Sequence, residues 1–343
     1  GTAVFFVYCT QRMGLNRTNE PRVLFLTLCA LATATFFLVT VRSEAITLDT
    51  TVNIINSPPT VVSVATSNTP FGAEYYPTGV INTLVPEGMR ALHVTGVVED
   101  MDGRLDIERV HAVFYRSGVT GGPDCSVNDA NDCYGRDNCT LQTDGGVTDQ
   151  QLRYNCEIPL QYYADGTMFG GEFPDEHWIL RVDATDATGA TTESDPVTRE
   201  IQTLLSVTFP TTISYGTLAP GESTDELTRV IQTVSQAGND EADVEVHYQT
   251  FVPPPFYGGT MDCVHNGGEG AIPNANQQWS LTAGGYGSSG TRALSTDPTI
   301  AALNVGYRHG VVPTKPLYWN ITIPATGVSG TCTGSITISA VSH

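Results

Sequence analysis

The fold class of this chain is decided by residues 176–184, EHWILRVDA. Trp178, Leu180 and Val182 fall on one phase of a two-residue period, and polar residues fill the other phase. Successive side chains of a β-strand point to opposite faces of a sheet, so this alternation predicts a strand with one buried face.

The same alternation recurs in 242–249 (ADVEVHYQ), 316–324 (PLYWNITIP) and 334–341 (GSITISAV). Turn residues such as Asp102-Gly103 separate the apolar runs. Half-buried strands joined by tight turns predict an all-β fold of antiparallel sandwiches. Residues 295–304 (STDPTIAALN) are expected to form at most one short helix, with Pro298 in its first turn.

Length and composition suggest two domains. The 343 residues include 34 Gly and 20 Pro, and only 15% are charged, which suits a turn-rich β protein. A change of pattern near 204–210 divides the chain into a first sandwich at 46–205, which starts with an extended lead-in at 46–55, and a second sandwich at 206–343.

Residues 1–45 are predicted to be a leader. Residues 23–41 form an uncharged apolar run that follows Arg17 and Arg22, and Ser43-Glu44-Ala45 offers a cleavage site after Ala45. An uncleaved anchor helix is the alternative, and it would be the chain's one attachment to a membrane. Either reading places the rest of the chain outside the cytoplasm.

The formal net charge of −20 makes nucleic acid and anionic lipid poor partners, because both repel an acidic surface. Two of the eight cysteines lie in the leader. An even number of cysteines after an export signal predicts disulfides. The preferred pairs are Cys125–Cys133, Cys139–Cys156 and Cys263–Cys332, and the first two pairs are one of three options for their four cysteines.

Several stretches carry a resemblance. In the first half these are 56–64 (NSPPTVVSV), 94–118 (VTGVVEDMDGRLDIERVHAVFYRSG) and 177–196 (HWILRVDATDATGATTESDP). They resemble the immunoglobulin-like or fibronectin-type-III-like modules of secreted prokaryotic surface proteins. The second half, with 213–223 (ISYGTLAPGES) and 271–281 (AIPNANQQWSL), resembles another exported β-sandwich. The resemblance implies a sandwich fold and an extracellular location, and it transfers no catalytic residue.

Two acidic stretches are candidate calcium sites, because Ca²⁺ binds through several converging oxygen ligands. The residues of the first are Asp124, Asn128, Asp129, Asn131 and Asp132, and those of the second are Asp100, Asp102 and Asp106. A loop shaped by disulfides and Asx turns explains the first stretch as well, and a tight turn between strands explains the second.

The sequence contains no G-x-S-x-G, H-E-x-x-H or P-loop motif, which argues against an enzyme, although a glycosidase needs only two carboxylates. Aromatic residues in or near loops could stack on sugars: Tyr75, Tyr76, Tyr134, Tyr162, Tyr163, Phe256, Tyr257 and Tyr286. The sequence therefore favours a non-enzymatic surface or envelope protein with structural or adhesive modules, whose partners are other surface proteins or glycans, and which needs no cofactor. A glycan-dependent or Ca²⁺-dependent binding module is the alternative, and a hydrolase comes third.

Overall fold

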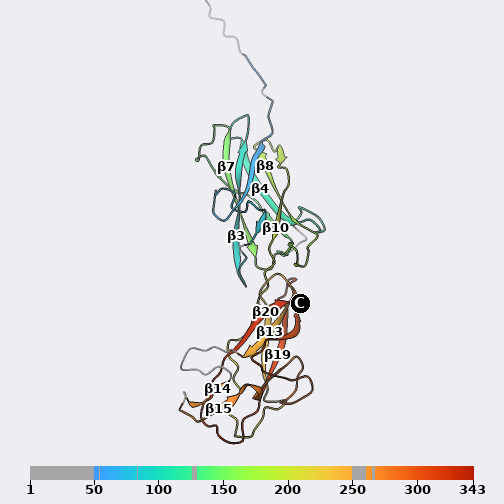
Figure 1. Cartoon of the computed structure of the whole chain (residues 1–343). Coiled ribbons are helices and arrows are strands. Elements are labelled where there is room, and N and C mark those ends of the chain that lie inside the picture. Colours follow the sequence, from blue (N-terminus) through green and yellow to red (C-terminus); the bar gives the residue numbers. More distant parts are fainter. Residues whose placement is uncertain (1–49, 54, 83, 126–129, 249–259, 265–266) are drawn as a thin grey trace, which may run out of the picture. The chain divides into compact units, whose positions relative to one another are not determined.

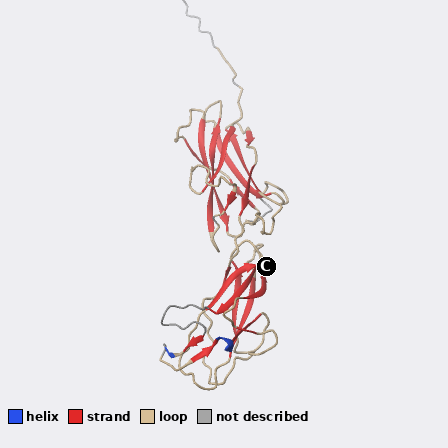
Figure 2. Ribbon diagram, viewed as in Figure 1, coloured by secondary structure: helices blue, strands red, loops and turns tan. Residues whose placement is uncertain are grey.

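The computed structural model describes residues 50–343 except 54, 83, 126–129, 249–259 and 265–266. The predicted leader therefore lies outside the described residues. Strands and loops make up nearly all of the described chain, and a short 3-10 helix, η2, covers Asn274–Asn276 (Figure 2). Within the described residues, no helix has the length and apolar character that crossing a membrane requires.

The first ten strands form two sheets, which we call the first sheet pair. The strands are β1 (Thr60–Ser67), β2 (Val80–Ile81), β3 (Met89–Glu99), β4 (Ile107–Arg116), β5 (Cys133–Arg136), β6 (Thr140–Gln142), β7 (Gln151–Gln161), β8 (Trp178–Asp186), β9 (Thr191–Glu193) and β10 (Val197–Ile201). One sheet has the order β1-β3-β7-β6, and the other has the order β2-β10-β8-β4-β5 with β9 beside β8. All their strand pairs are antiparallel except β2 with β10.

The two sheets of this pair share one apolar core. Strand β8 alternates as the sequence predicts, since Trp178, Leu180 and Val182 are fully buried between half-buried neighbours. The Trp178 ring stacks on Phe114 of β4 with 4.7 Å between centroids. Burying such rings removes much apolar surface from water, and this burial is the main driving force for the packing of the sheets.

The later strands form the second sheet pair and a small hairpin. They are β11 (Val207–Thr208), β12 (Val230–Gln236), β13 (Ala242–Tyr248), β14 (Thr260–Asp262), β15 (Ala271–Pro273), β16 (Gln277–Ser280), β17 (Arg292–Ala293), β18 (Thr299–Val305), β19 (Thr314–Ile321) and β20 (Ile336–Ser342). The sheet orders are β11-β12-β19-β16-β17 and β18-β13-β20, and β14 pairs with β15. Figure 1 shows β13, β19 and β20 together. Trp279 and Trp319 are buried in the core that these two sheets share.

The expectation of a short helix at 295–304 was wrong, because β18 occupies Thr299–Val305. Ala301, Leu303 and Val305 are buried, while the residues between them are exposed or half-buried. This two-residue period lets β18 pair with β13 and bury one face, and that packing overrides the local helix signal of Pro298.

Three disulfides join the six described cysteines: Cys125–Cys133, Cys139–Cys156 and Cys263–Cys332. These are the pairs that the sequence analysis preferred, and they indicate an oxidising, extracytoplasmic environment. Residues Asn56–His343 form one compact unit. Among the described residues, no sheet of this unit contains strands of both sheet pairs. The first sheet pair ends with β10, and the second begins with β11.

Candidate metal centre

The turn between β3 and β4 gathers carboxylates at one end of the first sheet pair. The N–H of Gly103 donates to the carbonyl of Asp100 at 3.1 Å, and the N–H of Asp106 donates to the carbonyl of Gly103 at 2.9 Å. Gly103 has φ 114°, a conformation that favours glycine. The Asp-Gly pair therefore makes the tight reversal that the sequence predicts, and this reversal turns three aspartates toward one another.

The carboxylates of Asp100, Asp102 and Asp106 each offer an oxygen, and these three oxygens lie within 4.8 Å of one another. Asp100 is 0% exposed. Its Oδ1 accepts the N–H of Asp102 at 2.8 Å, whereas its Oδ2 is buried and accepts no hydrogen bond. The protein therefore leaves one possible ligand atom of this cluster without a hydrogen bond. Burying a carboxylate oxygen without a partner costs free energy of folding.

A fourth carboxylate, Asp186, belongs to the same end of the sheet pair. It ends β8 opposite Ile107, the first residue of β4, and is itself 0% exposed. Its Oδ1 accepts the N–H and hydroxyl of Thr188 at 2.9 and 2.8 Å and the N–H of Ala190 at 2.9 Å. Its Oδ2 accepts the Asn56 amide at 2.7 Å. The pKa of Asp186 is lowered, first by the bond from Asn56 and then by the bonds from Thr188 and Ala190, which outweigh burial.

Mutual repulsion acts on the remaining members. The pKa of Asp106 is raised by burial and by the negative charges of Asp100, Asp186 and Asp102. The ion pairs found among the described residues include none of these four carboxylates. The cluster therefore concentrates negative charge without a basic side chain to balance it.

Asn56 and Ser57, the two residues that follow the lead-in, contact this cluster. The N–H of Ser57 donates to Oδ2 of Asp102 at 2.6 Å, one residue after Asn56 contacts Asp186. The N–H of Ala187 donates to the carbonyl of Asp106 at 2.8 Å and joins the two loops. Three segments far apart in sequence therefore meet at the carboxylates.

The described residues of the other predicted calcium stretch do not converge in this way. Asn128 and Asp129 lie outside the described residues. Asp124 and Asp132 belong to no group of three described acidic, His or Cys ligands. Asn131 is buried, and its amide donates to the carbonyls of Tyr163 at 2.9 Å and Arg308 at 2.5 Å.

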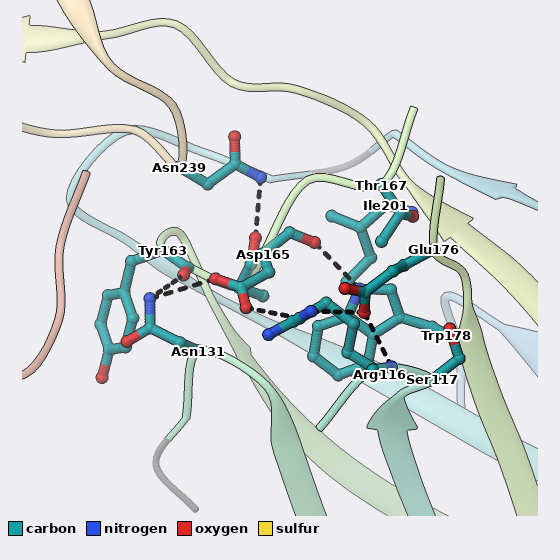
Figure 3. Close-up of polar contacts among 12 residues, drawn as sticks. Arg116, Ser117, Asn131, Tyr163, Asp165, Thr167, Glu176, Trp178, Ile201 and Asn239 are labelled. Atoms are coloured by element: carbon teal, nitrogen blue, oxygen red, sulfur yellow. Dashed lines mark hydrogen bonds and ion pairs between the residues drawn. The ribbon is translucent and has the colours of Figure 1, made fainter. Parts of the chain in front are cut away.

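A second group of carboxylates, the buried Asp165 and the half-buried Glu176, lies at the other end of β8 beside Arg116 (Figure 3). The Nε of Arg116 is 2.8 Å from Asp165 Oδ2, and Nη1 contacts Glu176. Burial raises the pKa of Asp165 to about 7, and the charge of Arg116 opposes that rise. The guanidinium also lies 3.7 Å from the centroid of Phe173. No sequence motif identifies this cluster, because its members come from separate loops and strand ends.

This arginine-centred cluster adjoins contacts to the second sheet pair. The Asn239 amide donates to the carbonyl of Ala164 at 2.8 Å (Figure 3). Its Oδ1 accepts the N–H of Leu204 at 2.6 Å. Arg308 donates to the hydroxyl of Tyr162 at 3.0 Å and lies 3.9 Å from the centroid of Tyr163. The polar network here joins the two sheet pairs.

The proposed sugar-stacking role was wrong for part of the aromatic set. Tyr76, Tyr134 and Tyr162 are buried, so their rings are packed inside the protein and offer no open face for a sugar. Phe256 and Tyr257 lie outside the described residues. Tyr75 keeps about half of its surface exposed.

No protein-family model matches this chain, and no curated protein matches it either.

Proposed function

We propose that the chain is a non-enzymatic, extracytoplasmic surface protein of two immunoglobulin-like β-sandwich modules, and that the first module binds Ca²⁺ through Asp100, Asp102 and Asp106. The observation that carries this proposal is the buried Oδ2 of Asp100, which has no hydrogen-bond partner among converging carboxylates.

Calcium is the cation that fits this donor set. Ca²⁺ takes six to eight oxygen ligands in flexible geometry, and carboxylates that converge from a loop meet that demand together with water. Zinc sites are instead built mainly from Cys and His, and neither residue type is part of this cluster. A divalent cation would also cancel the repulsion that raises the pKa of Asp106.

The proposed role of the ion is structural. Asp102 accepts a hydrogen bond from the backbone N–H of Ser57, and Asp186 accepts one from the side chain of Asn56. The loop that would bind the ion therefore also holds the first residues of the module after the lead-in. A bound cation would fix this loop and make the start of the first module rigid. Surface proteins work where calcium is plentiful, and a weak extracellular site is sufficient for such a role.

The disulfides and the charge support the rest of the proposal. Three disulfides suit an oxidising compartment, and the acidic surface disfavours nucleic acid and anionic lipid. We propose other surface proteins or glycans as partners of the structural or adhesive modules.

Thermal unfolding of residues 46–343 in EDTA and in CaCl₂ tests the cation site. At a Ca²⁺ concentration about 100-fold above Kd, the ion should add about 2.7 kcal/mol to the free energy of unfolding. Asp100→Asn should abolish this gain, because it removes a buried charge that faces the ion. Asp195→Asn removes an exposed carboxylate of the same module and should keep the gain. An equal response of both variants, or no response of the parent chain, would refute the site.

A further inference from the structure

Residues 46–343 contain two acceptor patterns for an N-linked glycan. The pattern Asn-x-Ser/Thr, in which x is not proline, occurs as Asn138-Cys139-Thr140 and as Asn320-Ile321-Thr322. The three disulfides indicate an oxidising, extracytoplasmic environment, and a surface asparagine in such an environment is where this pattern accepts a glycan. The fold decides which of the two asparagines has room for one.

Asn320 has no room for a glycan in the folded protein. It is 0% exposed. Its Oδ1 accepts the hydroxyl of Thr224 at 3.0 Å, and its Nδ2 donates to the carbonyl of Gly284 at 3.3 Å. A sugar bonded to Nδ2 would need space that a close-packed interior does not offer. The second acceptor pattern is therefore blocked by the fold.

Asn138 is presented to solvent beside an anchored neighbour. Asn138 and Thr140 are both exposed. Asn138 has φ 56°, a left-handed conformation that asparagine adopts more readily than most residues. The N–H of Cys139 donates to the carbonyl of Val110 at 2.9 Å, and the disulfide to Cys156 holds its side chain. The backbone is fixed on both sheets of the first sheet pair, and the side chain of Asn138 is left accessible.

Asn138 also lies between two edge strands. Among the described strands, β5 ends one sheet of the first sheet pair and β6 ends the other. Only residues 137–139 connect these strands, so both edges lie on the same side of the sheet pair. Edge strands carry unpaired backbone groups to which another chain can add, and charged side chains are a usual protection. Arg136 is the only charged residue in the two strands, so their own side chains protect these edges little.

We propose that Asn138 carries an N-linked glycan, which covers the edges of β5 and β6 and keeps them from pairing with another molecule. An oligosaccharyltransferase joins Nδ2 of Asn138 to the anomeric carbon of a lipid-linked oligosaccharide. The bond from that carbon to the lipid phosphate breaks, and the amide loses one proton to a base of the transferase. The attached glycan is bulky and hydrated, so it excludes a further strand from both edges. This proposal rests on the extracytoplasmic location and is independent of the cation site.

Mass spectrometry of residues 46–343, secreted from a host that carries an oligosaccharyltransferase, tests the acceptor. The parent chain should carry one glycan, and peptide N-glycosidase should remove it and leave aspartate at position 138. Thr140→Ala destroys the acceptor pattern and should abolish the glycan, whereas Thr140→Ser keeps both. The two variants are matched, since they change the same exposed position and leave Asn138 in place.

A parent chain without a glycan on Asn138, or a folded chain with a glycan on Asn320, would overturn the proposal. The same mass spectrum shows whether the six cysteines are oxidised. If Asn138 is unmodified and the cysteines are oxidised, the proposed extracytoplasmic location still stands. Reduced cysteines would refute that location as well.

Light scattering after size-exclusion chromatography tests the covering of the edges. The parent chain and Thr140→Ser should stay monomeric as the protein concentration rises. Thr140→Ala, and the parent chain after enzymatic removal of its glycan, should associate into larger particles. Equal melting temperatures of these two samples would show that the substitution leaves the fold intact. Thr140→Ala that stays as monomeric as Thr140→Ser would overturn the covering role.

Discussion

Carboxylates gather at both ends of β8 in the first sheet pair, and at least one of them is buried at each end, but their charge is balanced differently. At the Trp178 end, Arg116 contacts Asp165 and Glu176. At the Asp186 end, Asp100, Asp102 and Asp106 converge, and no described basic side chain pairs with them. One cluster therefore contains its own cationic side chain, and we propose that the other takes a cation from solution.

The largest expected effect comes from removing the internal cation. Arg116→Met leaves Asp165 and Glu176 without their partner, and the free energy of unfolding should fall by about 3–5 kcal/mol. Urea titration followed by tryptophan fluorescence measures it, because Trp178 packs beside this cluster. Arg104→Met is the matched control, since Arg104 pairs with a fully exposed Asp149 and should cost at most about 1 kcal/mol. A loss at Arg116 no greater than that of the control would contradict the assigned role.

An effect of opposite sign is expected at the cluster without an arginine. Asp106→Asn should raise the stability of the chain in EDTA at pH 7, because it removes a carboxylate that its neighbours repel. The same substitution should reduce the increase in the free energy of unfolding that Ca²⁺ produces. Comparing thermal unfolding of parent and variant in both buffers measures the two changes.

The pH dependence follows from the raised pKa of Asp106. In the parent chain without Ca²⁺, this carboxyl binds its proton more tightly folded than unfolded, so its contribution to stability falls as the pH rises from the ordinary value of 3.8 through the raised one. The advantage of Asp106→Asn in EDTA should therefore shrink as the pH is lowered toward 3.8. An advantage that is constant over this range would show that repulsion is not its source.

The smallest expected effect concerns the contact between Asn56 and Asp186. Asn56→Ala removes the hydrogen bond to Asp186 and should cost about 0.5–1.5 kcal/mol at neutral pH. Because this bond lowers the pKa of Asp186, its contribution is present above pH 3.8 and is lost as the pH falls through the lowered pKa. Chemical denaturation at pH 7 and at pH 3 measures the difference. Asn53→Ala, at an exposed position of the lead-in three residues earlier, is the control and should change the free energy of unfolding at neither pH.

The sequence predicted local features well. Alternation in 176–184 located β8 and its buried face, and Asp102-Gly103 located the turn that gathers the aspartates. These features depend on residues that are close together in the sequence, so the sequence alone can predict them. The sequence did not predict that Asp186 belongs to the cluster, because the pairing of β8 with β4 brings it close to Asp106 although the two residues are far apart in the sequence.

The features that the sequence missed depend on distant contacts. Arg116 and Asp165 are 49 residues apart, and nothing near either residue identifies the other. Asn320 lies on the predicted polar phase of its strand, yet it is fully buried, because Thr224 donates to its side chain and Gly284 accepts from it. Residues 295–304 were misread for the same reason, since pairing with β13 decides their conformation.

We propose that Ca²⁺ binds at the unpaired oxygen of Asp100, and a crystal structure of residues 46–343 grown in CaCl₂ tests this proposal. An anomalous difference peak is expected about 2.3–2.6 Å from carboxylate oxygens of Asp100, Asp102 and Asp106. A water molecule at that position, or a peak elsewhere with Asp100 Oδ2 still unliganded, would contradict it.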